Sequence, residues 1–254
     1  VCREWREAWG QRPTVTSIIP APETSVSQLR YSFKCGAPMY RMQVCTTIAG
    51  LGNLELLRCA REYGCPWDAG TFASAARGGR QDVVEHLAQN ACPWDWTACS
   101  WAAEGAHLAV LKRLREGRCP WNYATCSSAA RGGHVTVLQW ARANGCPWDE
   151  RTCEEAAKGG HLCVLRWARA NGCDWDERTC SAAARGGHLE ILMWARQHGC
   201  PWNYSTCSSA ARGGHLEVLR WARANGCDWK SSTGSNAAGG GHLDCLQWAL
   251  ENGC

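Results

Sequence analysis

RGGHLEVLRWARANGCDW, residues Arg212 to Trp229, occurs almost unchanged several times along this chain. It reappears as RGGHLEILMWARQHGCPW from Arg185 and as KGGHLCVLRWARANGCDW from Lys158. Near-identical stretches at a fixed interval are the signature of a repeat architecture. The histidines, cysteines and tryptophans in these stretches are therefore interpreted first as members of a repeat.

The period of the repeat is 27 residues, and one cysteine column keeps this spacing without a slip: Cys65, Cys92, Cys119, Cys146, Cys173, Cys200, Cys227 and Cys254. Seven full repeats follow from Cys65, and a degenerate one precedes them from about Pro38. We therefore divide the chain into a non-repeat segment, residues 1–37, and a repeat array, residues 38–254.

Each repeat predicts two short helices. The run TCEE at 152–155 has the form of a capping box, so the first helix should begin there. The two glycines at 159–160 should end it, and a second helix should run from His161 to Asn171 with apolar side chains at helical spacing. Helices of about seven and eleven residues are too short to persist alone in water. Each repeat therefore needs its neighbours, as in a solenoid.

The segment AAKGGHLCVLRWARANGC, residues 156–173, resembles the ankyrin repeat in its two alanines, its Gly-His turn, its Leu-x-Val-Leu helix and its terminal glycine. The resemblance covers about residues 39–254 and implies an all-α, ankyrin-like helix-turn-helix solenoid of about eight units. This unit is shorter than the family's repeat of about 33 residues. The missing residues fall between Gly172 and Thr179, where the family makes a projecting hairpin, so we expect shortened fingers or plain turns. Another short α-hairpin solenoid is the alternative architecture.

Repeated cysteine and histidine invite a metal or catalytic interpretation, which the spacing does not favour. Ligands of one zinc ion lie within about 4 Å of each other, whereas Cys153 and His161 should lie roughly 10 Å apart at the helical rise per residue. Phe72 and Gly234 occupy the Cys153 column, and His242 persists after Gly234, so the two columns vary independently. We therefore predict no metal, no cofactor and no catalytic residue.

The chain contains 19 cysteines, but the regular column does not fit a disulfide ladder. Adjacent helices pack about 8 to 10 Å apart, beyond the limit of about 7 Å between the Cα atoms of a disulfide. Free, packed cysteines suit a reducing intracellular compartment such as the cytoplasm, the nucleus or an organelle stroma. No stretch approaches the roughly 18 to 20 apolar residues of a membrane span.

The other regular columns are interpreted as parts of the frame. The histidine column should bond a backbone group of the adjoining unit, and the tryptophan columns, exemplified by Trp148 and Trp167, are assigned to the core. The arginine columns are able to grip phosphates, but cations near helix C-termini also favour the helix dipole. After the first 44 residues, which hold six basic and three acidic side chains, the chain has 21 basic and 20 acidic ones. This balance gives nucleic-acid binding little support.

A solenoid keeps its core columns fixed and varies the columns that contact a partner. By resemblance to ankyrin repeats, the variable positions after each Cys-x-Trp and along the first helix line the concave face. Large aromatic side chains there have the composition of binding hot spots. The predicted partner-binding residues are Trp96, Trp101, Tyr123, Glu150, Arg151, Glu154, Glu155, Glu177, Arg178 and Tyr204.

The resemblance implies a non-enzymatic protein-protein interaction scaffold that binds a partner protein or peptide through the concave face. Two alternatives are a structural subunit docked in a larger assembly and a nucleic-acid-binding solenoid. The last repeat carries Leu250 where earlier repeats have arginine. We therefore expect either that the chain continues or that a partner covers this end.

Overall fold

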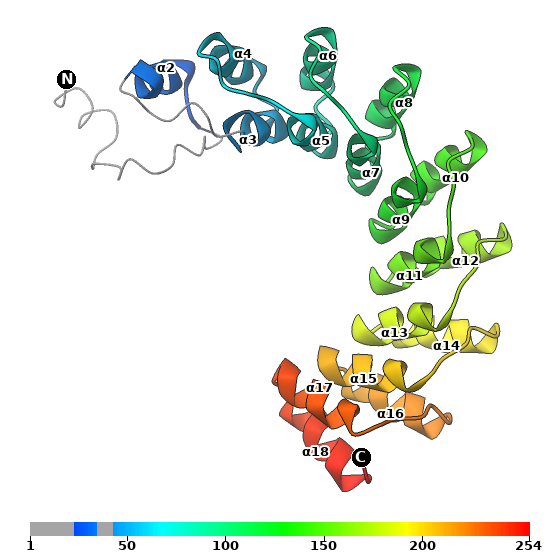
Figure 1. The fold of residues 1–254 in the computed structure, drawn as a ribbon. Coiled ribbons are helices and arrows are strands. Elements are labelled where there is room, and N and C mark those ends of the chain that lie inside the picture. The colour runs from blue at the N-terminus through cyan, green and yellow to red at the C-terminus, as the bar shows by residue number, and fades with distance from the viewer. Residues whose placement is uncertain (1–22, 35–42) are drawn as a thin grey trace. The chain divides into compact units, whose positions relative to one another are not determined.

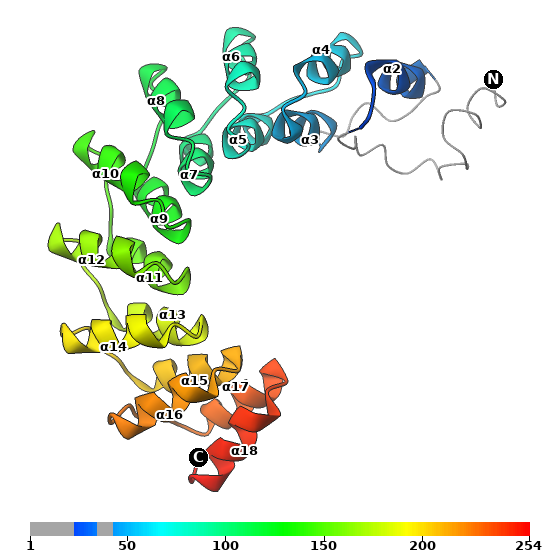
Figure 2. The same cartoon turned by 180° about the vertical axis from the view of Figure 1, so that it is seen from behind.

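The computed structural model describes residues 23–34 and 43–254. Within these ranges the chain forms 17 helices and no strand, and the helices pack serially as an all-α repeat solenoid (Figures 1 and 2). Residues 173–176 join two repeats without a strand, as do their counterparts in the other repeats described. The predicted fold class and the shortened fingers are therefore confirmed.

Eight helix pairs make up the described part of the array, and each pair has an inner and an outer helix. The inner helices are α3 (Gln43–Leu51), α5 (Ala69–Arg77), α7 (Trp96–Glu104), α9 (Tyr123–Arg131), α11 (Glu150–Lys158), α13 (Glu177–Arg185), α15 (Tyr204–Gly213) and α17 (Ser232–Gly240). The outer helices are α4 (Leu54–Glu62), α6 (Gln81–Gln89), α8 (Leu108–Glu116), α10 (Val135–Ala143), α12 (Leu162–Ala170), α14 (Leu189–Gln197), α16 (Leu216–Ala224) and α18 (Leu243–Glu251).

The structure corrects the predicted start of the inner helix. Helix α11 begins at Glu150, because the side chain of Asp149 caps it by accepting a hydrogen bond from the backbone amide of Arg151. Thr152 therefore lies inside the helix and is buried. Both helices of this repeat have nine residues, in place of the predicted seven and eleven.

The helix ends agree with the predicted glycine stops. Helix α11 is capped by Gly159, and Gly160 follows at a φ of +80°, in the left-handed region that favours glycine. Helix α12 is likewise followed by Gly172 at a φ of +80°. Two left-handed glycines in each such repeat reverse the chain twice and bring the next inner helix alongside the last.

The core lies between the helices of each pair and between neighbouring inner helices. Cys153, Ala156 and Ala157 of α11 are fully buried, as are Val164 and Leu165 of α12. Small side chains let the inner helices pack closely on one another, whereas neighbouring outer helices touch only sparingly. Burial in one repeat thus depends on the repeats beside it.

The chain divides into two compact blocks, residues 1–120 and residues 121–254, which we call the N-terminal and C-terminal blocks. In the N-terminal block a further helix, α2 (Val26–Lys34), packs against α4 and buries Leu29 and Phe33. It lies inside the predicted non-repeat segment, of which residues 1–22 and 35–37 are outside the described residues. In the C-terminal block Leu243 and Leu250 of α18 are exposed.

The invariant cysteine column joins consecutive repeats by thiol hydrogen bonds. The thiol of Cys146 donates to the backbone carbonyl of Asn122 at 3.4 Å, and that of Cys173 donates to the carbonyl of Asp149 at 3.3 Å. Each acceptor is the N-cap residue of an inner helix, 24 residues earlier in the chain. A one-residue insertion would move the thiol away from its acceptor, which accounts for the constant spacing.

A second cysteine column lies against the first. Interaction with the Cys173 thiol raises the pKa of the Cys153 thiol, and the thiol of Cys207 donates to the backbone carbonyl of Cys227 at 3.9 Å. These two columns were not expected to meet, since the spacing argument considered only equivalent cysteines. The cysteines of the described residues are nevertheless free thiols.

Burial should protect these thiols from alkylation. Burial raises the pKa of the Cys92 thiol to about 12 and that of Cys245 to about 11, so both stay protonated and unreactive at neutral pH. Cys163 is exposed and Cys254 half-buried. In native protein treated with iodoacetamide and analysed by peptide mass mapping, we expect the buried thiols to react more than about tenfold slower than Cys163. Equal rates for Cys163 and Cys92 would contradict the packing.

The histidine column forms a second joint between repeats, which confirms its predicted structural role. The Nε2 atom of His161 lies 2.9 Å from the backbone carbonyl of Arg131, and Nε2 of His215 lies 3.0 Å from that of Arg185. Because a carbonyl only accepts, Nε2 is the protonated donor. A Cβ atom on Gly133 would approach Nδ1 of His161 to 2.6 Å, so only glycine lets the ring reach its acceptor.

The tryptophans were assigned to the core, but the structure leaves them half-buried. Trp148 and Trp167 meet edge to face with ring centroids 5.8 Å apart. The guanidinium of Arg142 lies 4.2 Å from the Trp148 ring and donates to the Cys146 carbonyl at 2.5 Å. The arginines of the outer helices therefore have a structural role, because they cover the tryptophan rings and bond backbone carbonyls. They also lie near the helix C-termini.

Candidate interaction surface

The variable positions of the C-terminal block gather on the exposed side of its inner helices, α9, α11, α13, α15 and α17, which lie side by side (Figures 1 and 2). We call this side the inner-helix face. Eight of the ten predicted partner-binding residues belong to it: Tyr123, Glu150, Arg151, Glu154, Glu155, Glu177, Arg178 and Tyr204. The rings of Tyr123 and Tyr204 are accessible, since each residue is 39% exposed.

The N-caps position the side chains at the leading edge of this face. Asp149 and Asp176 each accept a hydrogen bond from the second amide of the helix that follows, at 3.1 and 3.0 Å. Helix geometry is thereby fixed from the first residue onward. Glu150, Arg151 and Arg178 consequently extend from a rigid turn.

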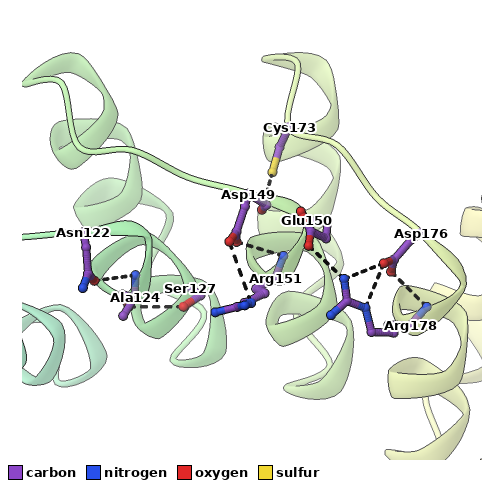
Figure 3. A network of polar contacts seen from close by, with 9 residues as sticks. All are labelled: Asn122, Ala124, Ser127, Asp149, Glu150, Arg151, Cys173, Asp176 and Arg178. Carbon is purple, nitrogen blue, oxygen red and sulfur yellow. Dashed lines mark hydrogen bonds and ion pairs between the residues drawn. The ribbon is translucent and has the colours of Figure 1, made fainter.

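Arg178 is the centre of the polar network on this edge (Figure 3). Its guanidinium lies 2.7 Å from Asp176 in its own repeat and 2.8 Å from Glu150 in the preceding repeat. Hydrogen bonds to Asp176 and Glu150 raise the pKa of Arg178, and a backbone hydrogen bond together with Arg178 lowers the pKa of Glu150. Exposed pairs of this kind contribute about 0 to 1 kcal/mol, so the network orders the edge more than it stabilises the fold.

Each predicted tyrosine carries a cation from the next repeat. The guanidinium carbon of Arg151 lies 4.5 Å from the centroid of the Tyr123 ring. The ammonium of Lys230 lies 3.7 Å from the centroid of the Tyr204 ring. These contacts hold the rings in place, so a partner would meet an ordered aromatic and cationic surface.

The two glutamates in the middle of α11 differ in environment. Glu155 pairs with Arg131 at 2.7 Å and lies 3.8 Å from Lys158. It therefore makes ion pairs and does not act as the capping-box glutamate that the sequence predicted. Glu154 is half-buried and forms no hydrogen bond or ion pair with the described residues, and burial raises the pKa of its carboxyl.

The other two predicted residues, Trp96 and Trp101, lie on α7 in the N-terminal block. Trp96 is 43% exposed, and Trp101 is half-buried with the Arg77 guanidinium 5.3 Å from its ring centroid. Arg77 also pairs with Glu104 at 3.5 Å. Both residues therefore lie outside the inner-helix face as defined for the C-terminal block.

Sequence reasoning missed the partners that complete this surface: Asp149, Asp176, Arg131 and Lys230. A positional signal was available for two contacts on this surface. Arg151 follows Tyr123 by 28 residues, as Arg178 follows Glu150, which is one repeat plus one residue. Pairs at this offset face each other across neighbouring inner helices.

The described residues hold no group of three or more His, Cys, Asp or Glu side chains that is able to bind a metal ion. None of their helices is long and apolar enough to cross a membrane. Together these features define an all-α repeat solenoid with an ordered, mixed-charge inner-helix face. Comparison with known proteins finds no matching family model and no matching curated protein.

Proposed function

We propose that this chain is a non-enzymatic scaffold that binds a partner protein or peptide on the inner-helix face. The observation that carries the proposal is a division of roles among its side chains. The histidines and cysteines that are able to do chemistry are bonded to backbone carbonyls of neighbouring repeats, as His161 is to Arg131 and Cys173 to Asp149. The residues that vary between repeats stand on the accessible inner-helix face instead.

The resemblance to ankyrin repeats supports the same proposal. The residues that carry it, the paired alanines, the Gly-Gly-His turn and the terminal glycine, occupy structural positions in the helix pairs. Solenoids of this kind present a long surface whose side chains vary without disturbing the core. We infer a protein or peptide partner, since the near-balanced charge of the array gives little support to nucleic acid. The buried free thiols favour a reducing compartment, namely the cytoplasm, the nucleus or an organelle stroma.

The proposal is tested by native affinity purification with the full chain as bait, followed by mass spectrometry. The test variant combines Tyr123→Ala with Tyr204→Ala. Binding of a recovered partner is expected to weaken by about 1 to 2 kcal/mol for each tyrosine that acts as a hot spot. Stability should change by less than about 1 kcal/mol in total, because both rings are exposed and each loses one cation contact.

The matched control combines Thr136→Ala with Glu217→Ala, exposed outer-helix positions that are three repeats apart, as the tyrosines are. This pair is preferable to Arg142 and Arg169, which hold tryptophan rings and backbone carbonyls in the frame. Equal affinities for the wild type and the tyrosine variant, with loss in the outer-helix control, would refute binding on the inner-helix face. A tyrosine variant that melts well below the wild type would show instead that the rings serve stability.

A further inference from the structure

Four charged side chains on the inner-helix face of the C-terminal block make no ion pair with any described residue. Two are carboxylates, Glu154 of α11 and Glu177 of α13, and two are guanidinium groups, Arg185 of α13 and Arg212 of α15. The neighbouring charges on α11 and α13 are paired: Glu150 with Arg178, and Glu155 with Arg131. These four positions are therefore the charged ones on these inner helices that have no ion-pair partner among the described residues.

The unpaired charges are separated by sign along the helices. Glu177 is the first residue of α13 and Arg185 the last, so they stand about 12 Å apart along the helix axis at the helical rise per residue. Between them lies Ser181, which is half-buried and whose hydroxyl is already bonded to Ser205. Helix α13 thus offers an acidic end and a basic end with a small, internally satisfied side chain between, and Glu154 of α11 occupies the position equivalent to Ser181.

Helix dipoles explain part of this pattern but not Glu154. Acids at helix N-termini and bases at C-termini are favourable in any helix, which accounts for Glu177, Arg185 and Arg212. Glu154 is the fifth residue of α11, away from either end, and it is half-buried. Burial raises the pKa of its carboxyl, so its charged form is disfavoured by folding and a cation supplied from outside would relieve that cost.

We propose that the inner-helix face of the C-terminal block binds an extended peptide segment with a basic and an acidic side chain about four residues apart. The basic side chain meets Glu154 and Glu177, and the acidic one meets Arg185 and Arg212. An extended chain rises about 3.3 Å per residue, so four residues span the 12 Å between the two ends. Residues i and i+4 of such a chain also point to the same side. This inference rests on the proposed function and specifies the chemistry of its partner.

The experiment pans random 12-residue peptides displayed on phage against the full 254-residue chain. We expect enriched peptides to share a basic and an acidic residue four positions apart. In fluorescence anisotropy, the synthetic consensus peptide should bind the double variant Glu154→Gln, Glu177→Gln about tenfold more weakly, and likewise Arg185→Gln, Arg212→Gln. The free energy of unfolding should change by less than about 1 kcal/mol for each substitution, because none of the four side chains makes an ion pair in the free protein and a helix-dipole contribution is small.

A charge exchange makes the test specific. The variant Glu154→Lys, Glu177→Lys should regain affinity, to within about threefold of the original, for a consensus peptide whose basic residue is replaced by glutamate. If peptides bind the Tyr123→Ala and Tyr204→Ala variants more weakly but bind all the charge variants as tightly as the wild type, this inference is overturned and the proposed function stays intact. Failure to enrich any peptide, or a consensus with charges seven to eight positions apart as in a helix, would also overturn it. The native purification tests the proposed function independently of these peptides.

Discussion

Replacing Leu165 by alanine is expected to lower the free energy of unfolding by about 3 kcal/mol, within the range for a fully buried leucine. Leu165 is 0% exposed and lies in α12 at its contact with α11. The loss should be local at first, since each repeat is stabilised by its neighbours. Urea denaturation followed by circular dichroism measures the total, and hydrogen exchange shows whether the repeats around α12 open first.

Trp167→Ala is the informative comparison for this variant. A fully buried tryptophan would be expected to cost about 3 to 5 kcal/mol on truncation. Trp167 is only half-buried, with its edge against Trp148, so we expect about 2 kcal/mol, less than for Leu165. If Trp167→Ala were the more damaging change, the tryptophan columns would be the core, as the sequence interpretation assumed.

The second large effect is expected for Gly160→Ala. Gly160 has a φ of +80°, where an L side chain costs about 1 to 2 kcal/mol. The new Cβ atom would also lie 2.7 Å from Cε1 of His188, whose Nε2 lies 3.2 Å from the Lys158 carbonyl. Displacing that ring should add about 0.5 to 1.5 kcal/mol for the lost hydrogen bond, giving a total of about 1.5 to 3.5 kcal/mol.

Gly172→Ala is a matched control for the histidine joint. Gly172 has the same φ of +80°, but no atom lies within 4 Å of the Cβ position. Its replacement should therefore cost only the backbone strain, about 1 to 2 kcal/mol. The difference between the two variants in denaturant unfolding measures the joint between repeats. Equal losses would mean that the histidine hydrogen bond contributes nothing to stability.

The predicted partner-binding residues show which features of the candidate site could be predicted from a single sequence. Variation between repeats correctly placed Tyr123 and Tyr204 on an accessible helix face, because core positions cannot vary without loss of packing. It did not show that Arg151 and Lys230 cover those rings, since each contact joins residues of different repeats. Whether this face binds a partner stays a prediction.

The start of the inner helix is a second feature that the sequence alone did not predict correctly. Both the Thr152 capping box and the Asp149 cap are plausible local signals, and they lie three residues apart. The choice falls to Asp149 because Thr152 is buried in the stack and the Asp149 carbonyl receives the Cys173 thiol. Tertiary contacts therefore decided which of the two local N-cap signals begins the helix.

The sequence by itself determined the period, the eight helix pairs and the glycine stops, because these depend on residues within one repeat and on their exact recurrence. It also indicated that the histidine column has a structural role between repeats. Only the tertiary structure decided which carbonyl each histidine and thiol reaches, and that tryptophan lies half-buried under arginine rather than in the core. The physical reason is range: helix propensity and capping act over a few residues, whereas the thiol and histidine contacts span 24 to 30 residues and exist only once neighbouring repeats have stacked in register.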